Sequence, residues 1–433
     1  MSRKSRYVLK FLSICAAAAV IFSAVFMSAC AFSREDWVRN MIEMYYYRFD
    51  GDYSSVRGMD GLSVDEMIAR LDRYSTFYTA EKYKQVLSQN EGHKTGIGLN
   101  VEQGENCVLV DSVIGGSPSE AAGIKSGMRI VSVSFDGIES RMTSKDDFMN
   151  FVASVPVGES AALTFSDGFT AEISKIEYTA SYVQMYLDEC NYSFVYEGGE
   201  RVIVKGDDGI AGLPKNAAYV HISQFYGNAA EELHELAKIF NDRRCDSLIL
   251  DLRGNGGGYV NVLAAVGGLF TSAVYGGDAV AMRARYKDNS EDIVKCVRYS
   301  SDVFSSDVKV YAMADSDTAS ASEALLGVLV SYNILEYKNI FLTEYAYEPV
   351  RTYGKGIMQT MLTDASGEAL KLTVAGVYWQ NGKTIHDVGL TLADGCRAAP
   401  ASDRVVSVGY DDEILPVIAA IEEENSKAAE PTE

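Results

Sequence analysis

The chain has 433 residues, a hydrophobic content of 47% and a formal net charge of -21 at pH 7. The length favours two to four domains, and the hydrophobic content is ample for buried cores, which excludes a wholly disordered chain. A surface this acidic repels phosphate backbones, so we expect no nucleic acid partner.

Residues 1–30 have the pattern of an export signal. Basic residues between positions 3 and 10 precede the apolar run Phe11–Ala29. Met27–Cys30 resembles a bacterial lipobox, in which Cys30 would be lipidated, although that pattern prefers Leu at the position of Met27. The alternative is an uncleaved membrane anchor, since about twenty apolar residues can just span a bilayer. Both interpretations predict an extracytoplasmic protein anchored to the bacterial cell membrane.

Residues 31–92 are expected to form an N-terminal helical region. Apolar residues recur at helical spacing from Trp37 to Tyr45 and again from Met67 to Leu71. These residues belong either to the core or to an exposed face for self-association, so a homodimer stays open.

Residues 94–177 contain β-type runs broken by Gly, Pro and Ser. Within them, Gly115–Gly127 has a small-residue helix followed by Ala-Gly-Ile-Lys-x-Gly, and in this it resembles a PDZ domain. Met128 departs from that pattern, which usually has Asp after the glycine. The expected strands are Cys107–Val113, Met128–Ser134 and Ala161–Phe165.

In a PDZ domain at this position, Gly96, Ile97, Gly98 and Leu99 would be the carboxylate-binding loop. Glycines there let successive backbone N–H groups converge on one anion, and the following strand edge can add a peptide by β-augmentation. A lone Gly-x-Gly is more often a simple turn.

Residues 178–208 show no clear motif and are expected to form a lid or a linker strand. Strands and helices then alternate up to residue 400, which favours right-handed crossovers and a mainly parallel sheet. Ligands in such sheets bind at the carboxyl ends of the strands. The acidic tail 401–433 is expected to be a short helix followed by disorder. The expected strands are Ala218–Ser223, Ser247–Asp251 and Lys309–Met313, and the expected helices are Ala229–Phe240, Val260–Leu269 and Glu323–Val330.

A glycine run follows the second of these strands, in Leu250–Gly258. Its backbone N–H groups could bind phosphate, but the lysine and hydroxyl residue of a P-loop are absent. They could instead form an oxyanion hole for a tetrahedral intermediate. A tight strand-to-helix turn is the structural alternative.

Ser320 and Glu323 have the Ser-x-x-Glu spacing of a helix capping box. A serine at a helix start can also be a nucleophile, because free amides and the helix dipole lie beside its developing oxyanion. The spacing alone favours the cap.

Lys355 lies between two glycines, and Gln359 follows four residues later. A neutral lysine amine can take the proton of a serine. Its pKa must first fall from about 10.4 to near 7, through burial and apolar neighbours. Gln359 could hold the amine by hydrogen bonding, whereas a lysine chosen at random would be a solvated surface residue.

Together these segments resemble the carboxyl-terminal processing peptidases, also called tail-specific proteases. The resemblance spans roughly residues 70–395. It rests on Leu71–Tyr78, Leu250–Gly258, Thr318–Glu323, Gly354–Gly356 and Gly382–Ile385, in the order of the family and with the PDZ pattern in its usual place.

The resemblance implies that Ser320 is the nucleophile, Lys355 the general base and Gln359 the residue that orients the lysine. The backbone amides of Gly258 and Ala321 would form the oxyanion hole. The fold would be multidomain α/β, with a mainly parallel-sheet serine-peptidase core at 178–400, an inserted β-rich PDZ domain at 94–177 and the N-terminal helical region. Substrates would be C-terminal tails of exported or membrane proteins, cleaved without a cofactor.

One departure concerns spacing, because the 35 residues from Ser320 to Lys355 exceed what the family usually shows. We expect an insertion within Asn333–Arg351 that could reshape the substrate cleft. Two other classes stay open: a non-catalytic PDZ scaffold or ligand-binding protein on a peptidase-like fold, and a metal-dependent hydrolase. The second lacks a His-x-x-x-His or clustered carboxylate signature.

The histidines and cysteines offer weaker alternatives. His221 is expected to be a core or rim residue and His234 to be solvated, which leaves a Ser320–His386 dyad as the alternative base arrangement. The cysteines after Cys30 are five in number and scattered, so they indicate neither a zinc site nor a disulfide framework, and at most a single disulfide.

Overall fold

The computed structural model describes residues 33–197, 200–207, 209–344, 350–400 and 412–429. The predicted export signal and Cys30 lie outside these residues, so lipidation and membrane anchoring stay predictions. In the part of the chain that is described, no helix is both long and apolar enough to cross a bilayer.

Three helices precede the β-rich domain: α2 (Arg34–Tyr45), α3 (Val64–Ile68) and α4 (Ala80–Asn90). Each begins after a Ser or Thr whose hydroxyl accepts a backbone N–H of the first turn. Helix α2 packs against β20 (Ala369–Tyr378), where Ile42 is fully buried and Met44 is 60% exposed. The apolar residues of this region are therefore divided between core and surface.

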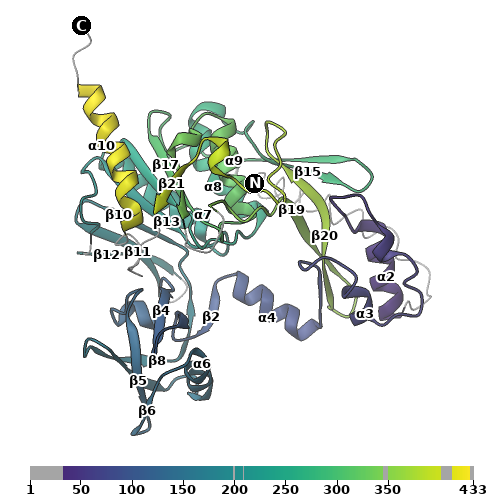
Figure 1. Cartoon of the computed structure of the whole chain (residues 1–433), viewed down its shortest axis with the longest axis horizontal. Helices are drawn as coiled ribbons and strands as arrows, with labels where there is room; N and C mark the ends of the chain where they lie inside the picture. The colour runs from purple at the N-terminus through teal and green to yellow at the C-terminus, as the bar shows by residue number, and fades with distance from the viewer. Residues whose placement is uncertain (1–32, 198–199, 208, 345–349, 401–411, 430–433) are drawn as a thin grey trace, which may run out of the picture.

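A β-rich domain projects from the rest of the molecule (Figure 1). Its antiparallel sheet has the order β3-β4-β5-β7-β8, with β6 paired to β5, and it encloses its own core around Val110, Ile130 and Phe148. The three predicted strands are confirmed to within one residue. The elements are β3 (Leu99–Gln103), β4 (Val108–Val113), α5 (Pro118–Ala121), β5 (Arg129–Phe135), β6 (Ile138–Arg141), α6 (Lys145–Ser154), β7 (Ser160–Phe165) and β8 (Thr170–Ser174). A two-stranded ladder of β2 (His93–Gly96) and β9 (Ile176–Thr179) joins this domain to the body.

The body contains an eight-stranded sheet of order β12-β11-β10-β13-β14-β17-β18-β21. The last five strands are parallel, as predicted: β13 (Ala217–Ile222), β14 (Ser247–Asp251), β17 (Lys309–Ala314), β18 (Ile340–Glu344) and β21 (Arg397–Pro400). The prediction of a lid or single linker strand at 178–208 is wrong. That segment adds three antiparallel strands, β10 (Val183–Leu187), β11 (Cys190–Glu197) and β12 (Glu200–Gly206).

Helices cover both faces of this sheet. Helices α7 (Ala229–Asp242), α8 (Val260–Tyr275) and α9 (Ala321–Ser331) pack on the face that carries Leu248, Leu250 and Ala312. Helix α10 (Leu415–Ala429) packs on the face that carries Ile249 and Tyr311. Successive strand residues point to opposite faces, which explains this division.

A second, antiparallel sheet lies beside the N-terminal helices (Figure 1) and was not predicted. Its order is β1-β20-β15-β16, and β19 also pairs with β20. It consists of β1 (Thr76–Tyr78), β15 (Val280–Tyr286), β16 (Glu291–Lys295), β19 (Ile357–Thr363) and β20. Because β19 begins two residues after Lys355, this sheet positions the lysine side of the candidate site.

Candidate active site

Ser320 lies between the end of β17 and the start of α9, with φ 58° and ψ -113°. Positive φ is strained for a residue that has a Cβ, and such strain persists only where the surroundings enforce it. The Ser320 N–H donates to Glu323 Oε2 at 3.0 Å, so Glu323 caps the helix as predicted. Ser320 can therefore be a helix-cap residue and a nucleophile at once, because its contact with the Glu323 carboxyl uses the backbone N–H.

The glycine loop after β14 is fastened to the serine loop by Asn255, which is fully buried. Its carbonyl accepts the Ala319 N–H at 3.0 Å and the Ser322 hydroxyl at 2.9 Å. Gly257 approaches even more closely, because a Cβ on it would lie 2.8 Å from the backbone nitrogen of Ala321. With φ of +100°, this position requires glycine on both counts.

Two backbone amides next to Ser320 have no acceptor among the described residues. The neighbouring N–H groups of Gly257 and Tyr259 are used, by Asn255 Oδ1 and the Phe225 carbonyl, but that of Gly258 is not. The Ala321 N–H, in the first turn of α9, is also unused. Free donors beside a nucleophile are what an oxyanion hole requires.

The lysine loop is held by the same carboxyl that caps the serine loop. Glu323 Oε2 accepts the N–H of both Ser320 and Lys355, the latter at 2.9 Å. Its Oε1 accepts the Gly354 N–H at 2.8 Å and the Thr352 hydroxyl at 2.6 Å. Burial raises the pKa of this fully buried carboxyl, and the four donated hydrogen bonds oppose that rise. One side chain thus fixes the relative position of the two candidate catalytic loops.

The Lys355 amine is in an environment that favours its neutral form. Burial, and then repulsion by the nearby charge of Lys371, lower the pKa of Lys355 to about 8. The carboxylates of Asp72 and Glu323 act in the opposite direction. The pKa thus moves in the predicted direction, although it stays above the predicted value of about 7.

The Lys355 amine and the Ser320 hydroxyl do not hydrogen-bond to each other in this part of the structure. The Lys355 Nζ lies 4.8 Å from the centre of the Tyr74 ring. Gln359 Nε2 donates to Thr373 Oγ1 at 3.1 Å rather than to the lysine. The structure thus brings the two loops together without closing the pair, and the orienting role of Gln359 stays a prediction.

His386, the alternative base, lies against the loop that carries Lys355, and the Ser320–His386 pair stays an alternative. Its backbone packs against Gly356, where a Cβ would lie 2.7 Å from the His386 nitrogen, and its ring lies 4.5 Å from that of Phe49. Burial lowers the pKa of His386 and of His221. In the described residues neither histidine bonds to Ser320.

The segment Asn333–Arg351 is not simply an insertion at the cleft. Residues Ile340–Glu344 form β18, which pairs with β17 and β21 inside the main sheet. Residues 345–349 lie outside the described part of the chain. Residues 340–344 are therefore part of the main sheet, and the expected insertion elsewhere within Asn333–Arg351 stays a prediction.

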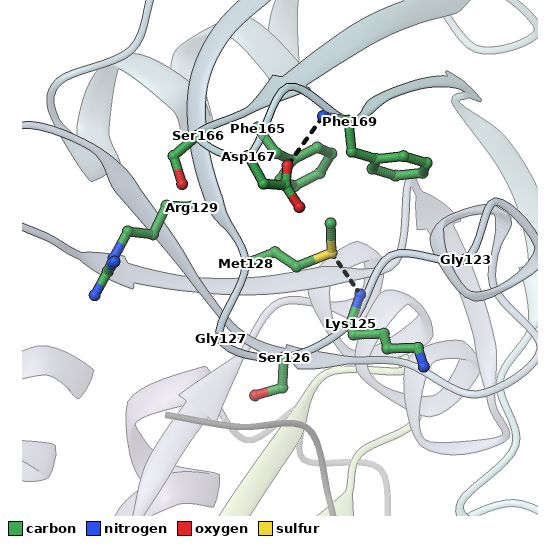
Figure 2. Close-up of a pocket in the computed structure, with 10 residues that line it drawn as sticks. All are labelled: Gly123, Lys125, Ser126, Gly127, Met128, Arg129, Phe165, Ser166, Asp167 and Phe169. Atoms are coloured by element: carbon green, nitrogen blue, oxygen red, sulfur yellow. Dashed lines mark hydrogen bonds between the residues drawn. The ribbon is translucent and has the colours of Figure 1, made fainter. Parts of the chain in front are cut away.

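On the β-rich domain, Gly96 ends β2 and Leu99 begins β3, with Gly98 between them at φ +87°. A small apolar hollow adjoins this loop and is lined by Ile97, Phe151 and Leu163, among others. A larger cavity of about 530 Å³ surrounds Met128 elsewhere on the same domain. Figure 2 shows Met128 at its centre, its sulfur accepting the Lys125 N–H at 3.1 Å.

The sequence did not predict that Tyr74 and Lys371 are neighbours of Lys355. Tyr74 lies within Leu71–Tyr78, a segment used only for the resemblance. Lys371 lies two residues before Thr373 on β20, so the two side chains share a face, and Thr373 pairs directly with Gln359. Recognising β19 and β20 as a hairpin would have revealed Lys371.

Within the described residues, no group of His, Cys, Asp and Glu side chains is arranged to hold a metal ion. The five cysteines that are described, Cys107, Cys190, Cys245, Cys296 and Cys396, are all free, so the structure contains no disulfide between them.

Comparisons with known proteins agree with this geometry. Residues 216–338, which include the glycine loop and Ser320, match the model of peptidase family S41. The chain is 25% identical over 355 residues to a protein of Staphylococcus epidermidis named probable CtpA-like serine protease. It is also 25% identical, over 357 residues, to a protein of that name in Staphylococcus aureus. The predicted resemblance to the carboxyl-terminal processing peptidases is confirmed.

The two alignments cover 81% of this chain but only 63% of each staphylococcal relative. Among solved structures, a candidate S41 protease from Bacteroides fragilis superposes with a TM-score of 0.60 at 14% identity. That superposition covers 92% of this chain and 99% of the Bacteroides chain. The present chain therefore has the mixed α/β fold of that S41 structure.

Proposed function

We propose that this chain is an exported serine endopeptidase that cleaves polypeptides through an acyl-enzyme formed on Ser320. The single observation that carries the proposal is the buried Glu323 carboxyl, which accepts the backbone N–H groups of both Ser320 and Lys355. A cap alone would not require the second contact. The amides of Gly258 and Ala321, which have no acceptor among the described residues, would supply the donors that the developing oxyanion needs.

In the first step, neutral Lys355 Nζ takes the Ser320 hydroxyl proton while Oγ bonds to the substrate carbonyl carbon. The tetrahedral oxyanion collapses, the peptide C–N bond breaks, and the leaving amine takes the proton back from Lys355. Water then attacks the ester with Lys355 again as base, which releases the acid and restores Ser320. Because the amine and hydroxyl are not hydrogen-bonded in this structure, substrate binding would complete the pair.

The β-rich domain would act as a PDZ domain that captures the C-termini of exported or membrane proteins. The Gly96–Leu99 loop would bind the terminal carboxylate, and the edge of the strand that follows it would pair with the peptide. The predicted signal and Cys30 would place the enzyme on the outer side of the cell membrane. Self-association through the N-terminal helices remains part of this proposal.

The test compares the full chain with Ser320→Ala and Lys355→Met on an unfolded polypeptide with an apolar C-terminal residue. Each variant should lose at least about a thousandfold in kcat, as expected when a nucleophile or its base is removed. Cleavage by Ser320→Ala at the wild-type rate would overturn the proposal. Loss of activity on adding a chelator would favour the metal-dependent class.

A fluorophosphonate probe separates the enzyme from a non-catalytic scaffold, because only an activated serine reacts with it. We expect labelling of the wild type in the presence of a C-terminal peptide and none of Ser320→Ala. An unlabelled wild type would support the scaffold.

A further inference from the structure

The amine of Lys355 has little in the described structure to hold it. Its Nζ donates no hydrogen bond to any described residue and forms no ion pair with one. Its defined contact is with the face of the Tyr74 ring, 4.8 Å from the ring centre. A lysine side chain has a flexible four-carbon stem, so the amine can occupy many positions. A contact at its tip therefore decides where the amine lies.

Tyr74 itself is firmly held. Its N–H donates to Asp72 Oδ1 at 2.8 Å, and its hydroxyl bonds to the Tyr353 hydroxyl at 3.1 Å. Arg73 donates to the same Tyr74 hydroxyl at 2.9 Å. The Tyr353 N–H in turn donates to the Thr318 carbonyl at 3.0 Å, so the ring is tied to the loop that carries Ser320.

We propose that Tyr74 is a positioning residue for Lys355, whose ring face seats the lysine amine beside the serine loop. This inference rests on the proposed function. An aromatic face attracts a cation and also shields it from water, so the ring both directs the side chain and keeps it dry. Without it, the amine would sample many positions, and few of them would be productive for proton transfer.

Two substitutions separate the ring from its hydroxyl. Tyr74→Phe keeps the ring face and loses only the bonds to Tyr353 and Arg73, whereas Tyr74→Leu keeps apolar bulk and loses the ring. We expect kcat to fall about tenfold in Tyr74→Leu and to stay within about threefold in Tyr74→Phe, with KM changed by less than about threefold in both. Tyr74→Met serves as the second variant if Leu lowers the melting temperature.

An NMR measurement on the full chain tests, independently of catalysis, whether the Tyr74 ring lies over the Lys355 amine. Lysine labelled with ¹³C at Cε is followed by NMR, and the Lys355 signal is assigned by its loss in Lys355→Arg. A ring over the amine shifts the Cε protons upfield, so this shift should persist in Tyr74→Phe and vanish in Tyr74→Leu.

If the NMR shift of the Lys355 Cε protons is unchanged in Tyr74→Leu, the inference that the Tyr74 ring positions the amine is wrong. Equal kcat in the wild type and Tyr74→Leu would also show that it is wrong. An equal loss of kcat in both variants would assign the effect to the hydroxyl and also overturn the inference. Because the NMR shift does not depend on cleavage, it decides whether the ring positions the amine even if Ser320→Ala shows that the proposed function is wrong.

Discussion

The serine loop and the lysine side chain differ in how firmly they are held. Ser320 has a strained backbone that Glu323 fixes, in a loop that Asn255 and Gly257 pack against. Lys355 shares the Glu323 contact through its N–H, but its amine lies well beyond that anchor, against the Tyr74 ring. The proposed nucleophile is thus held by backbone contacts, whereas the pKa of the proposed base is set by its environment. Disturbing each side should therefore have different signatures.

Gly257→Ala should cause the largest loss of kcat/KM, because it disturbs the backbone contacts that hold the Ser320 loop. The added Cβ would lie 2.8 Å from the Ala319 carbonyl oxygen and the Ala321 nitrogen, at a φ of +100°. Displacing the serine loop by about 1 Å can cost roughly a hundredfold in rate. We expect kcat/KM to fall at least that far, measured on the unfolded polypeptide, together with a lower melting temperature.

Gly256→Ala is the matched control, because a Cβ there meets no heavy atom within 4 Å and no positive φ is required. It should behave like the wild type. Equal losses in both variants would mean that the close approach at Gly257 is not what holds Ser320.

Glu323→Gln should reduce activity less than Gly257→Ala, and it should disturb the Ser320 loop and the Lys355 loop together. All four groups on this carboxyl are donors, so an amide NH₂ would face one pair of them and leave it unsatisfied. Such a loss costs about 1–3 kcal/mol in the free energy of unfolding. We expect that change in urea denaturation and a fall in kcat of about tenfold or more.

Glu232→Gln is its control in a different region. This carboxyl is also fully buried and accepts four hydrogen bonds, from Ser181, Tyr182, Val183 and Tyr196. It fastens the strand after the β-rich domain and is not part of the candidate site. A similar loss of stability with little change in kcat is expected, and an equal loss of kcat would argue that Glu323 acts only through stability.

Local sequence signals predicted the serine side well. The apolar strand Ser247–Asp251 is found with its predicted ends, and the Ser-x-x-Glu spacing predicted the Glu323 contact at the start of α9. These features depend on residues close in the chain, where strand pattern and capping chemistry act.

The lysine side depends on contacts between distant segments. Tyr74 reaches Lys355 only because β1 pairs with β20, which also pairs with β19. The sequence offered no signal for that register, and the second sheet and the strands at 183–206 were missed. The capping spacing also could not show that Glu323 would bind the Lys355 N–H, 32 residues away. The effect of Lys371 on the pKa of Lys355 was also not predictable, because it depends on which face of β20 Lys371 occupies.

Lys371→Met tests the environment of the base and should have the smallest effect. Lys371 on β20, Asp72 before β1 and Glu323 on α9 are the charged groups that act on the pKa of Lys355. Removing the Lys371 charge removes a repulsion, so the pKa of Lys355 should rise above about 8. Less of the amine is then neutral at pH 7, and the acid limb of the kcat/KM profile should move to higher pH by about half a unit to one unit.

Lys371→Arg retains a charge at every pH and should leave that limb in place. The rate of Lys371→Met at pH 7 should fall about three- to tenfold, as follows from a shift of that size, and should recover above pH 9. Recovery is the decisive feature, because a misplaced amine would be slow at every pH, whereas a base whose pKa alone has changed regains its rate once it is deprotonated. A uniform loss across the profile would therefore show that Lys371 supports the position of Lys355, and a limb that does not move would show that its charge does not act on the base.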